Sequence, residues 1–273
     1  MIPSQCCIVI PVYKPIANSF EKRAFRQCLR KFNARDIFIA VPISLDVSYY
    51  LRIAQRERAH FHIKTFEPKF FESISGYNQL LLNAEFYSQF SNYDYLLIYQ
   101  LDAYVFEDDL DEWCQRSINY IGAPLPHDLA KSIEKGHNQK SIYKVTLDHV
   151  FNGGASLRKT QAFYNVLSSC GELIDALYKD GLNEDVIFSA LLPNQPDISD
   201  IEALRFSFDI FPIDCYNRNG KQLPMLCHAW SKPPSPIGET GFDFWLYHIW
   251  RSRYYSYKVY LLFYRIIKKL HLS

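Results

Sequence analysis

The sequence lacks a glycine-rich phosphate-binding loop of either common type, GxGxxG or GxxxxGK[ST]. We therefore do not expect phosphate binding through such a loop. It also lacks any Cys-x-x-Cys pair, and its seven cysteines are odd in number, widely spread and without zinc-site spacing. We expect these cysteines to be small buried side chains of a protein that works in a reducing compartment.

Long apolar runs and an excess of charge are missing as well. No window approaches the roughly 18 apolar residues that a membrane-spanning helix needs. The opening MIPSQCCIVIPVYK has no charged segment followed by an adequate apolar core, which disfavours secretion and predicts a cytoplasmic protein. With 30 Lys and Arg against 29 Asp and Glu, the formal charge of +1 argues against a nucleic-acid partner.

The chain does have enough apolar residues for one large core. Hydrophobic residues make up 48% of its 273 residues, and a chain of this size removes about 75% of its unfolded surface from water. Strand-like apolar runs alternate with helical patterns over the first hundred residues, which predicts an α/β fold with a mostly parallel sheet flanked by helices. The expected strands are Cys6–Val12, Asp36–Val41, Phe61–Phe66 and Tyr95–Gln100, and the expected helices are Ser19–Phe32, Val47–Arg58 and Ser75–Phe90.

In the second half of the chain, the spacing of apolar residues indicates helices and strands less clearly. The polar segment Asp128–Tyr143 has no clear periodicity and is expected to be a mobile loop. Further strands are expected at Tyr120, Val150–Arg158, Phe206–Ile213 and Met225–Ala229, and further helices at Leu110–Arg116, Lys159–Ser169 and Asn183–Leu192.

Polar side chains follow the buried strand that ends near Gln100. In open α/β sheets, ligands bind in the crevice beyond the carboxyl ends of the strands. We therefore expect Asp102 to face a site rather than the core.

Four segments in order carry a family resemblance: IVIPVYKP at Ile8, YQLDAYVF at Tyr99, FNGGASLR at Phe151 with NEDVIFS at Asn183, and CHAW at Cys227. As a set they resemble the GT-A-fold nucleotide-sugar glycosyltransferases, and most closely a poorly characterised bacterial group among them. The resemblance spans roughly residues 6 to 230. It implies a GT-A domain over residues 1–240 with a mixed, mostly parallel sheet, followed by a helical tail over residues 241–273.

The resemblance implies donor-binding residues in two places. Pro11, Val12 and Tyr13 would hold the base and ribose, with Lys14 near the diphosphate, although these residues also fit a buried strand with a surface loop. Two more residues would contact the nucleotide or the sugar, or alternatively cap a helix: Tyr77 and Asn78.

A divalent metal is implied as well. Gln100, Leu101 and Asp102 stand where the family has Asp-x-Asp, whose carboxylates hold Mn²⁺ or Mg²⁺ on the sugar diphosphate. Here the first acid is glutamine, which leaves one carboxylate for the ion. His228 resembles the late histidine that completes the metal shell, and its alternative is a purely structural role.

The resemblance also implies residues for the sugars and for proton transfer. Asn152, Gly153 and Gly154 would form a tight turn beneath the donor or acceptor sugar, the alternative being a β-bulge. Asp185 would be the catalytic base of an inverting transfer and Glu184 would contact the acceptor. The alternative for this pair is acids that complement a helix dipole.

The implied activity is transfer from a nucleotide sugar, expected to be a UDP-sugar, to a saccharide or lipid-linked acceptor in bacterial surface-polysaccharide assembly. Two other classes remain open. One is a catalytically silent sugar-nucleotide or glycan-binding module, which the glutamine in QLD favours. The other is a nucleotidyltransferase, which the missing glycine-rich loop disfavours.

The last segment, Trp245–Ser273, is basic and aromatic and contains no acid. Arg251, Lys258 and Arg265 recur every seven residues, and apolar residues gather on another helical face. This pattern is typical of a helix in an anionic membrane interface, and it predicts peripheral binding at the inner face of the cell membrane. A terminal helix packed on the core is the alternative.

Overall fold

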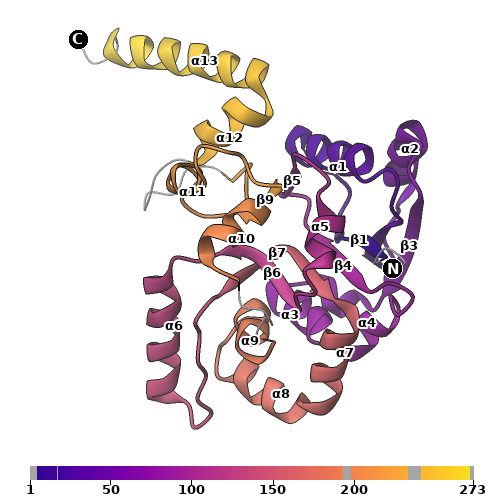
Figure 1. Ribbon diagram of the computed structural model, residues 1–273. Coiled ribbons are helices and arrows are strands. Elements are labelled where there is room, and N and C mark those ends of the chain that lie inside the picture. The colour runs from indigo at the N-terminus through magenta and orange to yellow at the C-terminus, as the bar shows by residue number, and fades with distance from the viewer. Residues whose placement is uncertain (1–4, 17, 193–197, 233–240, 271–273) are drawn as a thin grey trace.

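The computed structural model describes residues 5–16, 18–192, 198–232 and 241–270, with side chains described up to residue 262. A six-stranded sheet in the order β3-β2-β1-β4-β7-β6 forms its centre (Figure 1). β1 to β4 are parallel, whereas β7 runs antiparallel to both β4 and β6. The strands are β1 (Cys6–Pro11), β2 (Ile37–Pro42), β3 (Phe61–Phe66), β4 (Tyr95–Tyr99), β6 (Tyr120–Pro124) and β7 (Phe151–Lys159). The prediction of a mixed, mostly parallel sheet is confirmed.

Helices cover both faces of this sheet, which explains the unbroken apolar runs of its inner strands. Every residue of β1, β2 and β4 is buried, as expected for strands between two helical layers. α1 (Ser19–Lys31) and α2 (Ser48–Glu57) lie on one side (Figure 1). The other side carries α3 (Ile74–Leu81), α4 (Ala84–Ser88), α7 (Thr160–Ser169), α8 (Gly171–Lys179) and α9 (Glu184–Leu191).

A small second sheet joins three short strands from distant parts of the chain. Its order is β5-β9-β8, with β9 antiparallel to β5 and parallel to β8. The strands are β5 (Tyr104–Val105), β8 (Ser207–Phe208) and β9 (Leu226–Cys227). The remaining helical elements are η1 (Pro68–Phe71), α5 (Leu110–Gln115), α6 (His127–Lys140), α10 (Asp200–Phe206), α11 (Pro212–Arg218), α12 (Gly241–Ile249) and α13 (Arg251–Leu270).

The prediction of a mobile loop over Asp128–Tyr143 is wrong, because most of this segment forms α6. Only Ala130 and His137 of the helix are buried, so the sequence has little apolar periodicity there. The helix is held by the chain that returns along it. Glu134 accepts a hydrogen bond from the Leu147 amide (2.6 Å), and the Asn138 side chain bonds both backbone groups of Val145 (2.8 and 2.9 Å).

Three other expected elements are shorter than predicted, one of them the strand expected over Met225–Ala229, which is only β9. The helix expected over Ser75–Phe90 is two helices, because Asn83 ends the run and its side chain caps α4 through the Glu85 amide. The strand expected over Phe206–Ile213 is only β8, after which the chain turns into α11 at Pro212. α8, α10 and α11 were not predicted.

All seven cysteines are free, as the sequence predicted, and all but the half-buried Cys170 are buried.

The C-terminal helices differ in how they meet the body of the protein. α12 buries Trp245, Leu246 and Ile249, whereas α13 extends away from the sheet (Figure 1). Within the residues that the structure describes, no helix combines the length and apolarity needed to span a bilayer. Six tail residues that belong to the expected basic and apolar faces have side chains outside the described part: Phe263, Arg265, Ile266, Lys268, Lys269 and Leu270.

Candidate functional site

The small sheet brings three polar side chains to one of its edges. Asp102 lies just before β5, while His228 and Asp209 lie just after β9 and β8. Because β9 is parallel to β8 and antiparallel to β5, the ends of β8 and β9 and the start of β5 share one edge. Backbone hydrogen bonds fix this register, from the His228 amide to the Phe208 carbonyl (2.9 Å) and from the Trp230 amide to the Asp102 carbonyl (3.2 Å).

His228 is the centre of this group. Its Nε2 lies 3.0 Å from Oε1 of Gln100 and 3.2 Å from Oδ1 of Asp102. Its Nδ1 lies 3.3 Å from Oδ1 of Asp209. The imidazole is only 5% exposed, so it is packed between these groups. The structure thus brings His228 to the Gln100-Leu101-Asp102 motif, from which the sequence separates it by more than 120 residues.

The electrostatics of the group favour a positive charge. Burial alone would lower the pKa of His228, but the carboxylates of Asp102 and Asp209 outweigh it and raise that pKa to about 9. Burial would likewise raise the pKa of Asp102, yet His228 and Lys232 hold it well below its ordinary value. Lys232 lies 3.5 Å from Oδ2 of Asp102. The cation that the two carboxylates hold is the imidazolium itself, so Nε2 has to lose its proton before it can bind a metal ion.

The donor atoms of this group fit a divalent ion. Neighbouring ligands of an octahedral ion with bonds of about 2.1 Å lie about 3 Å apart, which matches the separations of Gln100 Oε1 and Asp102 Oδ1 from His228 Nε2. Asp209 on Nδ1 orients the ring as carboxylates do behind metal-binding histidines. Among the described residues, no cluster of three or more His, Cys, Asp or Glu side chains could hold a metal. The third donor would therefore have to be the Gln100 amide, and the mixed oxygen and nitrogen set suits Mn²⁺ or Mg²⁺.

A cavity of about 490 Å³ opens beside this group at the carboxyl ends of β1 and β4. Its position follows the rule for ligand sites in open α/β sheets. Seven residues that the resemblance placed at the donor line it: Pro11, Tyr13, Lys14, Tyr77, Gln100, Leu101 and Asp102. The rest of its wall, which the sequence did not indicate, is Glu21 and the segment 70–74 between β3 and α3.

The walls of the cavity combine exposed aromatic surface with polar groups. The Tyr13 ring is 61% exposed, and the Lys14 ammonium lies 5.1 Å from its centre and 3.4 Å from Glu21. The Tyr77 hydroxyl is buried close to Gln100 but meets hydrogen-bond geometry with no described atom. Burial raises the pKa of Tyr77, so this hydroxyl stays protonated and can donate to a ligand.

Five predicted donor residues do not line the cavity. Val12 is buried, and Asn78 donates to the Asn183 side chain (3.3 Å). Asn152, Gly153 and Gly154 lie in β7, where the register against β6 shifts between Ile121 and Ala123. The expected tight turn is therefore a β-bulge.

The two glycines of this bulge make room for protein side chains. A Cβ on Gly154 would overlap the His228 imidazole, and a Cβ on Gly153 would overlap the Glu184 carboxylate. Their missing side chains allow the histidine and the acid to pack on the strand, so the described structure already accounts for both glycines.

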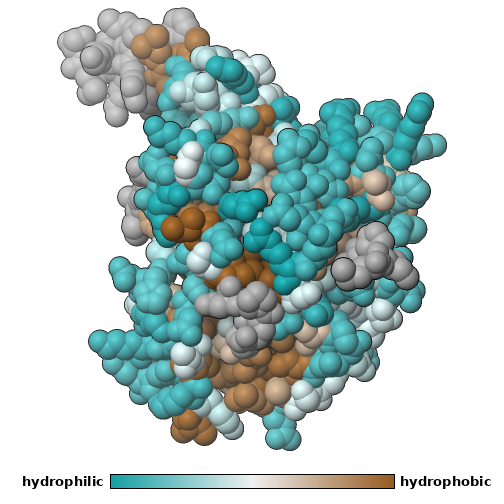
Figure 2. Space-filling model, in the orientation of Figure 1, coloured by the Kyte–Doolittle hydropathy of each residue, from teal (hydrophilic) through white to brown (hydrophobic). Residues whose placement is uncertain are grey.

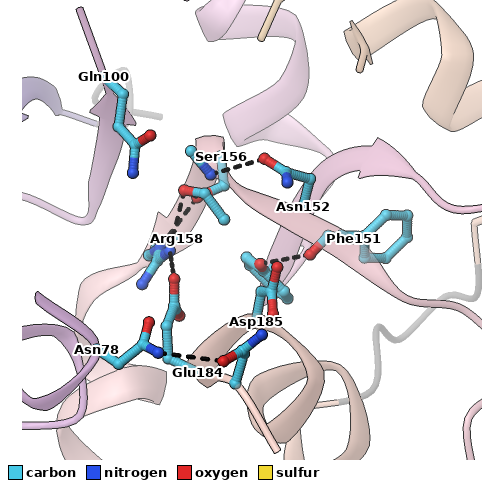
Figure 3. Close-up of polar contacts among 12 residues, drawn as sticks. Asn78, Gln100, Phe151, Asn152, Ser156, Arg158, Glu184 and Asp185 are labelled. Carbon is cyan, nitrogen blue, oxygen red and sulfur yellow. Dashed lines mark hydrogen bonds and ion pairs between the residues drawn. The ribbon is translucent and has the colours of Figure 1, made fainter. Parts of the chain in front are cut away.

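Glu184 forms a buried ion pair that the sequence did not predict. Its Oε1 lies 3.1 Å from Nη2 of Arg158, which is fully buried (Figure 3). Arg158 also donates to Ser156 (3.0 Å), Tyr87 (2.8 Å) and the Gly153 carbonyl (3.2 Å). Glu184 is 4% exposed and its Oε2 is buried without a partner in the described structure. The pair ties the start of α9 to β7.

Asp185 is the more accessible acid of the two. It is partly buried at the first turn of α9, where its carboxylate accepts a hydrogen bond from the Val186 amide (2.9 Å). Burial raises the pKa of Asp185, while the amides of Val186 and Gly153 oppose that rise. A partly accessible carboxylate with a raised pKa is suited to accept a proton.

Two residues of the site were missed although the sequence carried a signal for each. Asp209 follows Phe206-Ser207-Phe208, an alternating segment typical of a short strand, so it also stands at the end of a strand. Arg158 is a charged residue within a predicted strand, FNGGASLR, and a charge that is buried in a sheet needs a partner of opposite charge.

Comparison with known families identifies the family of this chain. A sequence model of the family described as "Protein of unknown function (DUF5672)" matches residues 60–228, and the chain belongs to this family. The matched range contains Asp102, Glu184, Asp185, Asp209 and His228 and ends before the basic tail. No curated protein matches the sequence.

Solved structures show the kind of fold. The glycosyltransferase GlyE of Streptococcus pneumoniae TIGR4 is similar with a TM-score of 0.54 and 13% identity, over 90% of this chain and 60% of that one. Core-mannan synthase A (CmsA/Ktr4) of Aspergillus fumigatus, in its Mn/GDP form, has a TM-score of 0.46 and 10% identity, over 70% of this chain and 71% of that one. The fold is glycosyltransferase-like, as the sequence predicted; at such identities the likeness concerns the fold alone.

Proposed function

We propose that this member of the DUF5672 family is a glycosyltransferase that moves a sugar from a nucleotide-diphosphate donor to a saccharide or lipid-linked acceptor. The observation that carries the proposal is the meeting of Gln100, Asp102 and His228 beside the 490 Å³ cavity. The chemistry requires charge neutralisation where a diphosphate leaves and a base where a hydroxyl attacks. The described residues offer a candidate for each task.

The cavity suits the nucleotide part of the donor. The exposed Tyr13 ring offers a surface on which a base can stack, and Lys14 is placed to approach a phosphate. The Tyr77 hydroxyl, which has no hydrogen-bond partner among the described atoms, can donate to a phosphate or sugar oxygen. We propose a UDP-sugar as donor.

Gln100, Asp102 and His228 would hold the divalent ion, Mn²⁺ or Mg²⁺. Such an ion supplies positive charge next to the leaving diphosphate. Asp209 keeps the His228 ring in the orientation in which Nε2 faces Gln100 and Asp102. With one carboxylate instead of two, we expect binding of the ion to depend strongly on the donor phosphates.

Asp185 is the proposed base that takes the proton of the acceptor hydroxyl, and the transfer is then inverting. Its raised pKa and partial exposure support this role. Glu184 was expected to contact the acceptor, but its burial against Arg158 favours a positioning role: it holds the helix that begins with both acids.

A screen of nucleotide sugars for thermal stabilisation, with and without Mn²⁺, tests the function. A donor at 100 times its Kd stabilises the folded state by about 2.7 kcal/mol, which raises Tm by several degrees. Release of nucleoside diphosphate in the presence of Mn²⁺, abolished by Asp102→Ala, would support an enzyme. Binding without turnover would support the silent module, release of pyrophosphate would indicate a nucleotidyltransferase, and no shift with any donor would contradict the proposal.

We also propose that α13 binds the anionic inner face of the cell membrane, where lipid-linked acceptors of surface-polysaccharide assembly are held. Tyr255, Val259 and Leu262 are more than half exposed and, spaced four and three residues apart, share one helical face. Arg251 and Arg253 are exposed at the start of the helix. Apolar side chains and arginines on one exposed helix suit an anionic interface.

A further inference from the structure

Another pocket, of about 230 Å³, lies between α6 and the turn that joins α8 to α9. We call it the α6 pocket. Three buried side chains form its floor: His137, Ser141 and Leu182. Three exposed side chains stand at its rim: Ser132, Lys140 and Asp180. Figure 2 shows hydrophilic surface over α6 and hydrophobic surface beside it, over α8 and α9, so the pocket has a mixed setting.

Gly136 indicates that the space of the α6 pocket is kept open. It lies inside α6 and lines the pocket, and no described atom lies within 4 Å of a Cβ built on it. Glycine inside a helix is less favourable than alanine, and no close neighbour requires it here. A larger side chain at this position would take up part of the pocket. A ligand that occupies this space would account for the glycine.

The polar groups of the rim are only partly engaged within the protein. The Ser141 hydroxyl donates to Oδ2 of Asp180 and so ties the end of α6 to the end of α8. Within the described part of the chain, three rim groups have no hydrogen-bond or ion-pair partner: Oδ1 of Asp180, the Ser132 hydroxyl and the Lys140 ammonium. These groups are available to a ligand.

This rim suits a neutral ring that carries hydroxyl groups. A hydroxyl both donates and accepts hydrogen bonds, so a sugar can bond both the Asp180 carboxylate and the Lys140 ammonium. An anion would be repelled by Asp180, and a cation would be repelled by Lys140. Sites for drug-sized ligands have volumes of about 300–1,000 Å³. The α6 pocket is smaller, at about 230 Å³, and suits a single sugar ring rather than a nucleotide.

The α6 pocket adjoins the chain segment that carries the proposed base. Leu182 lines the pocket and Asp185 follows three residues later, so their Cα atoms are at most about 11 Å apart. Between them, the Asn183 side chain accepts a hydrogen bond from Asn78 (3.3 Å). Asn78 follows Tyr77, which lines the cavity proposed for the donor. The start of α9 therefore borders both the α6 pocket and the donor side of the site.

We propose that the α6 pocket binds a neutral sugar ring of the acceptor. The hydroxyls of the ring bond Asp180 and Lys140 at the rim, and its C–H face lies over Gly136, where no side chain stands. This inference rests on the proposed function and names the place of its second substrate.

Gly136→Leu tests the pocket without weakening the fold. Leucine is a better helix former than glycine, so Tm should rise by about 2–3 °C while the side chain fills the open space. Gly171→Leu is the matched control, because Gly171 lies in α8, has no described atom within 4 Å of its Cβ and does not line the pocket. Asp180→Asn keeps the shape of the rim and removes its negative charge.

Saturation-transfer NMR measures the binding of four neutral probes: the methyl glycosides of glucose, galactose, mannose and N-acetylglucosamine. We expect transfer to the ring protons of at least one probe. The transfer should fall fivefold or more with Gly136→Leu and threefold or more with Asp180→Asn, because hydrogen bonds to charged groups are the stronger ones. It should be retained with Gly171→Leu. No transfer to any probe, or transfer that Gly136→Leu or Asp180→Asn leaves unchanged, would overturn the proposal.

Thermal shift with UDP and GDP in the presence of Mn²⁺, measured on the same samples, separates this inference from the proposed function. Stabilisation by a nucleotide without saturation transfer overturns the α6 pocket alone. Saturation transfer that Gly136→Leu abolishes, without stabilisation by either nucleotide, supports a sugar-binding pocket but contradicts the enzyme and, with it, the acceptor.

Discussion

The α-carbon of Gly154 lies against the imidazole of His228, so that a methyl group on Gly154 would overlap Nε2. Gly154→Ala must therefore push the ring away from Gln100 and Asp102. If these residues bind a divalent ion, we expect affinity for Mn²⁺ to fall at least tenfold, because the donor atoms would no longer converge. Isothermal titration with Mn²⁺ in the presence of UDP measures this.

Gly136→Ala is the control for this substitution, since nothing lies within 4 Å of a Cβ at Gly136 in α6. It should leave Mn²⁺ affinity unchanged and raise stability by about 0.5–1 kcal/mol, as alanine does for glycine within a helix. Equal Mn²⁺ affinities for both variants would contradict a metal role for His228.

Asp209 is expected to act on the metal through His228 and not by direct contact. Asp209→Asn leaves a side chain that bonds Nδ1 differently and no longer supplies negative charge. We expect a 10- to 100-fold loss of Mn²⁺ affinity, the usual effect of removing such a supporting partner. Asp175→Asn, an exposed acid of α8, is the matched control. Electron paramagnetic resonance of Mn²⁺ measures the affinity of both variants for the ion. If Asp209→Asn changes neither the spectrum nor the affinity, Asp209 does not have this role.

The Arg158–Glu184 pair should dominate the stability of the β7 and α9 junction. Removing one partner of a buried ion pair leaves an uncompensated charge and costs about 3–5 kcal/mol. We expect Glu184→Leu and Arg158→Met each to lower the free energy of unfolding in urea by this amount. The double variant should recover much of the loss. Additive effects of the two substitutions would mean that the residues do not act as a pair.

Glu57 gives a pH-dependent contribution far from the site. Hydrogen bonds from Arg30 and Arg26 lower its pKa, against the opposing effect of burial, and join α2 to α1. A carboxylate with a lowered pKa in the folded state stabilises the protein above its ordinary pKa and loses that effect as the pH falls through the lowered value. The Tm of Glu57→Gln should therefore lie below that of the unmodified chain at pH 7 and approach it below about pH 4. A Tm difference that does not change with pH would contradict this explanation.

The exposed face of α13 can be tested with vesicles. Leu262→Glu replaces an apolar side chain, 59% exposed, with a negative charge. Loss of buried apolar surface and repulsion by anionic lipid should together weaken binding to phosphatidylglycerol vesicles at least tenfold. Gln55→Glu in α2 makes the same change of net charge on another surface and should have no effect. Co-sedimentation of both variants with anionic and with neutral vesicles measures this binding.

The central sheet could be predicted from the sequence because its inner strands are buried on both faces. Such strands must be unbroken apolar runs, and CCIVIP, IFIAVP and YLLIY are recognisable without any partner. The place of Asp102 followed from the same pattern, since a polar residue that ends a buried strand lies at the sheet edge.

Elements stabilised by tertiary contacts could not be predicted in this way. α6 depends on side chains such as Glu134 and Asn138 bonding a backbone that returns several residues later. The two-residue strands β8 and β9 are too short to show the alternation of apolar and polar residues that identifies a strand. The function of Gly153 and Gly154 was also hidden, because the atoms that occupy their space, from Glu184 and His228, come from remote parts of the chain.

The three short strands of the small sheet have a consequence for biosynthesis. Asp102 belongs to the first half of the chain, whereas Asp209 and His228 belong to the last third, so the group around His228 stays incomplete until nearly the whole domain has been translated. A nascent chain that ends before β8 lacks Asp209 and His228 and cannot form this group. If the group binds a metal ion as proposed, uptake of the ion reports that folding is complete.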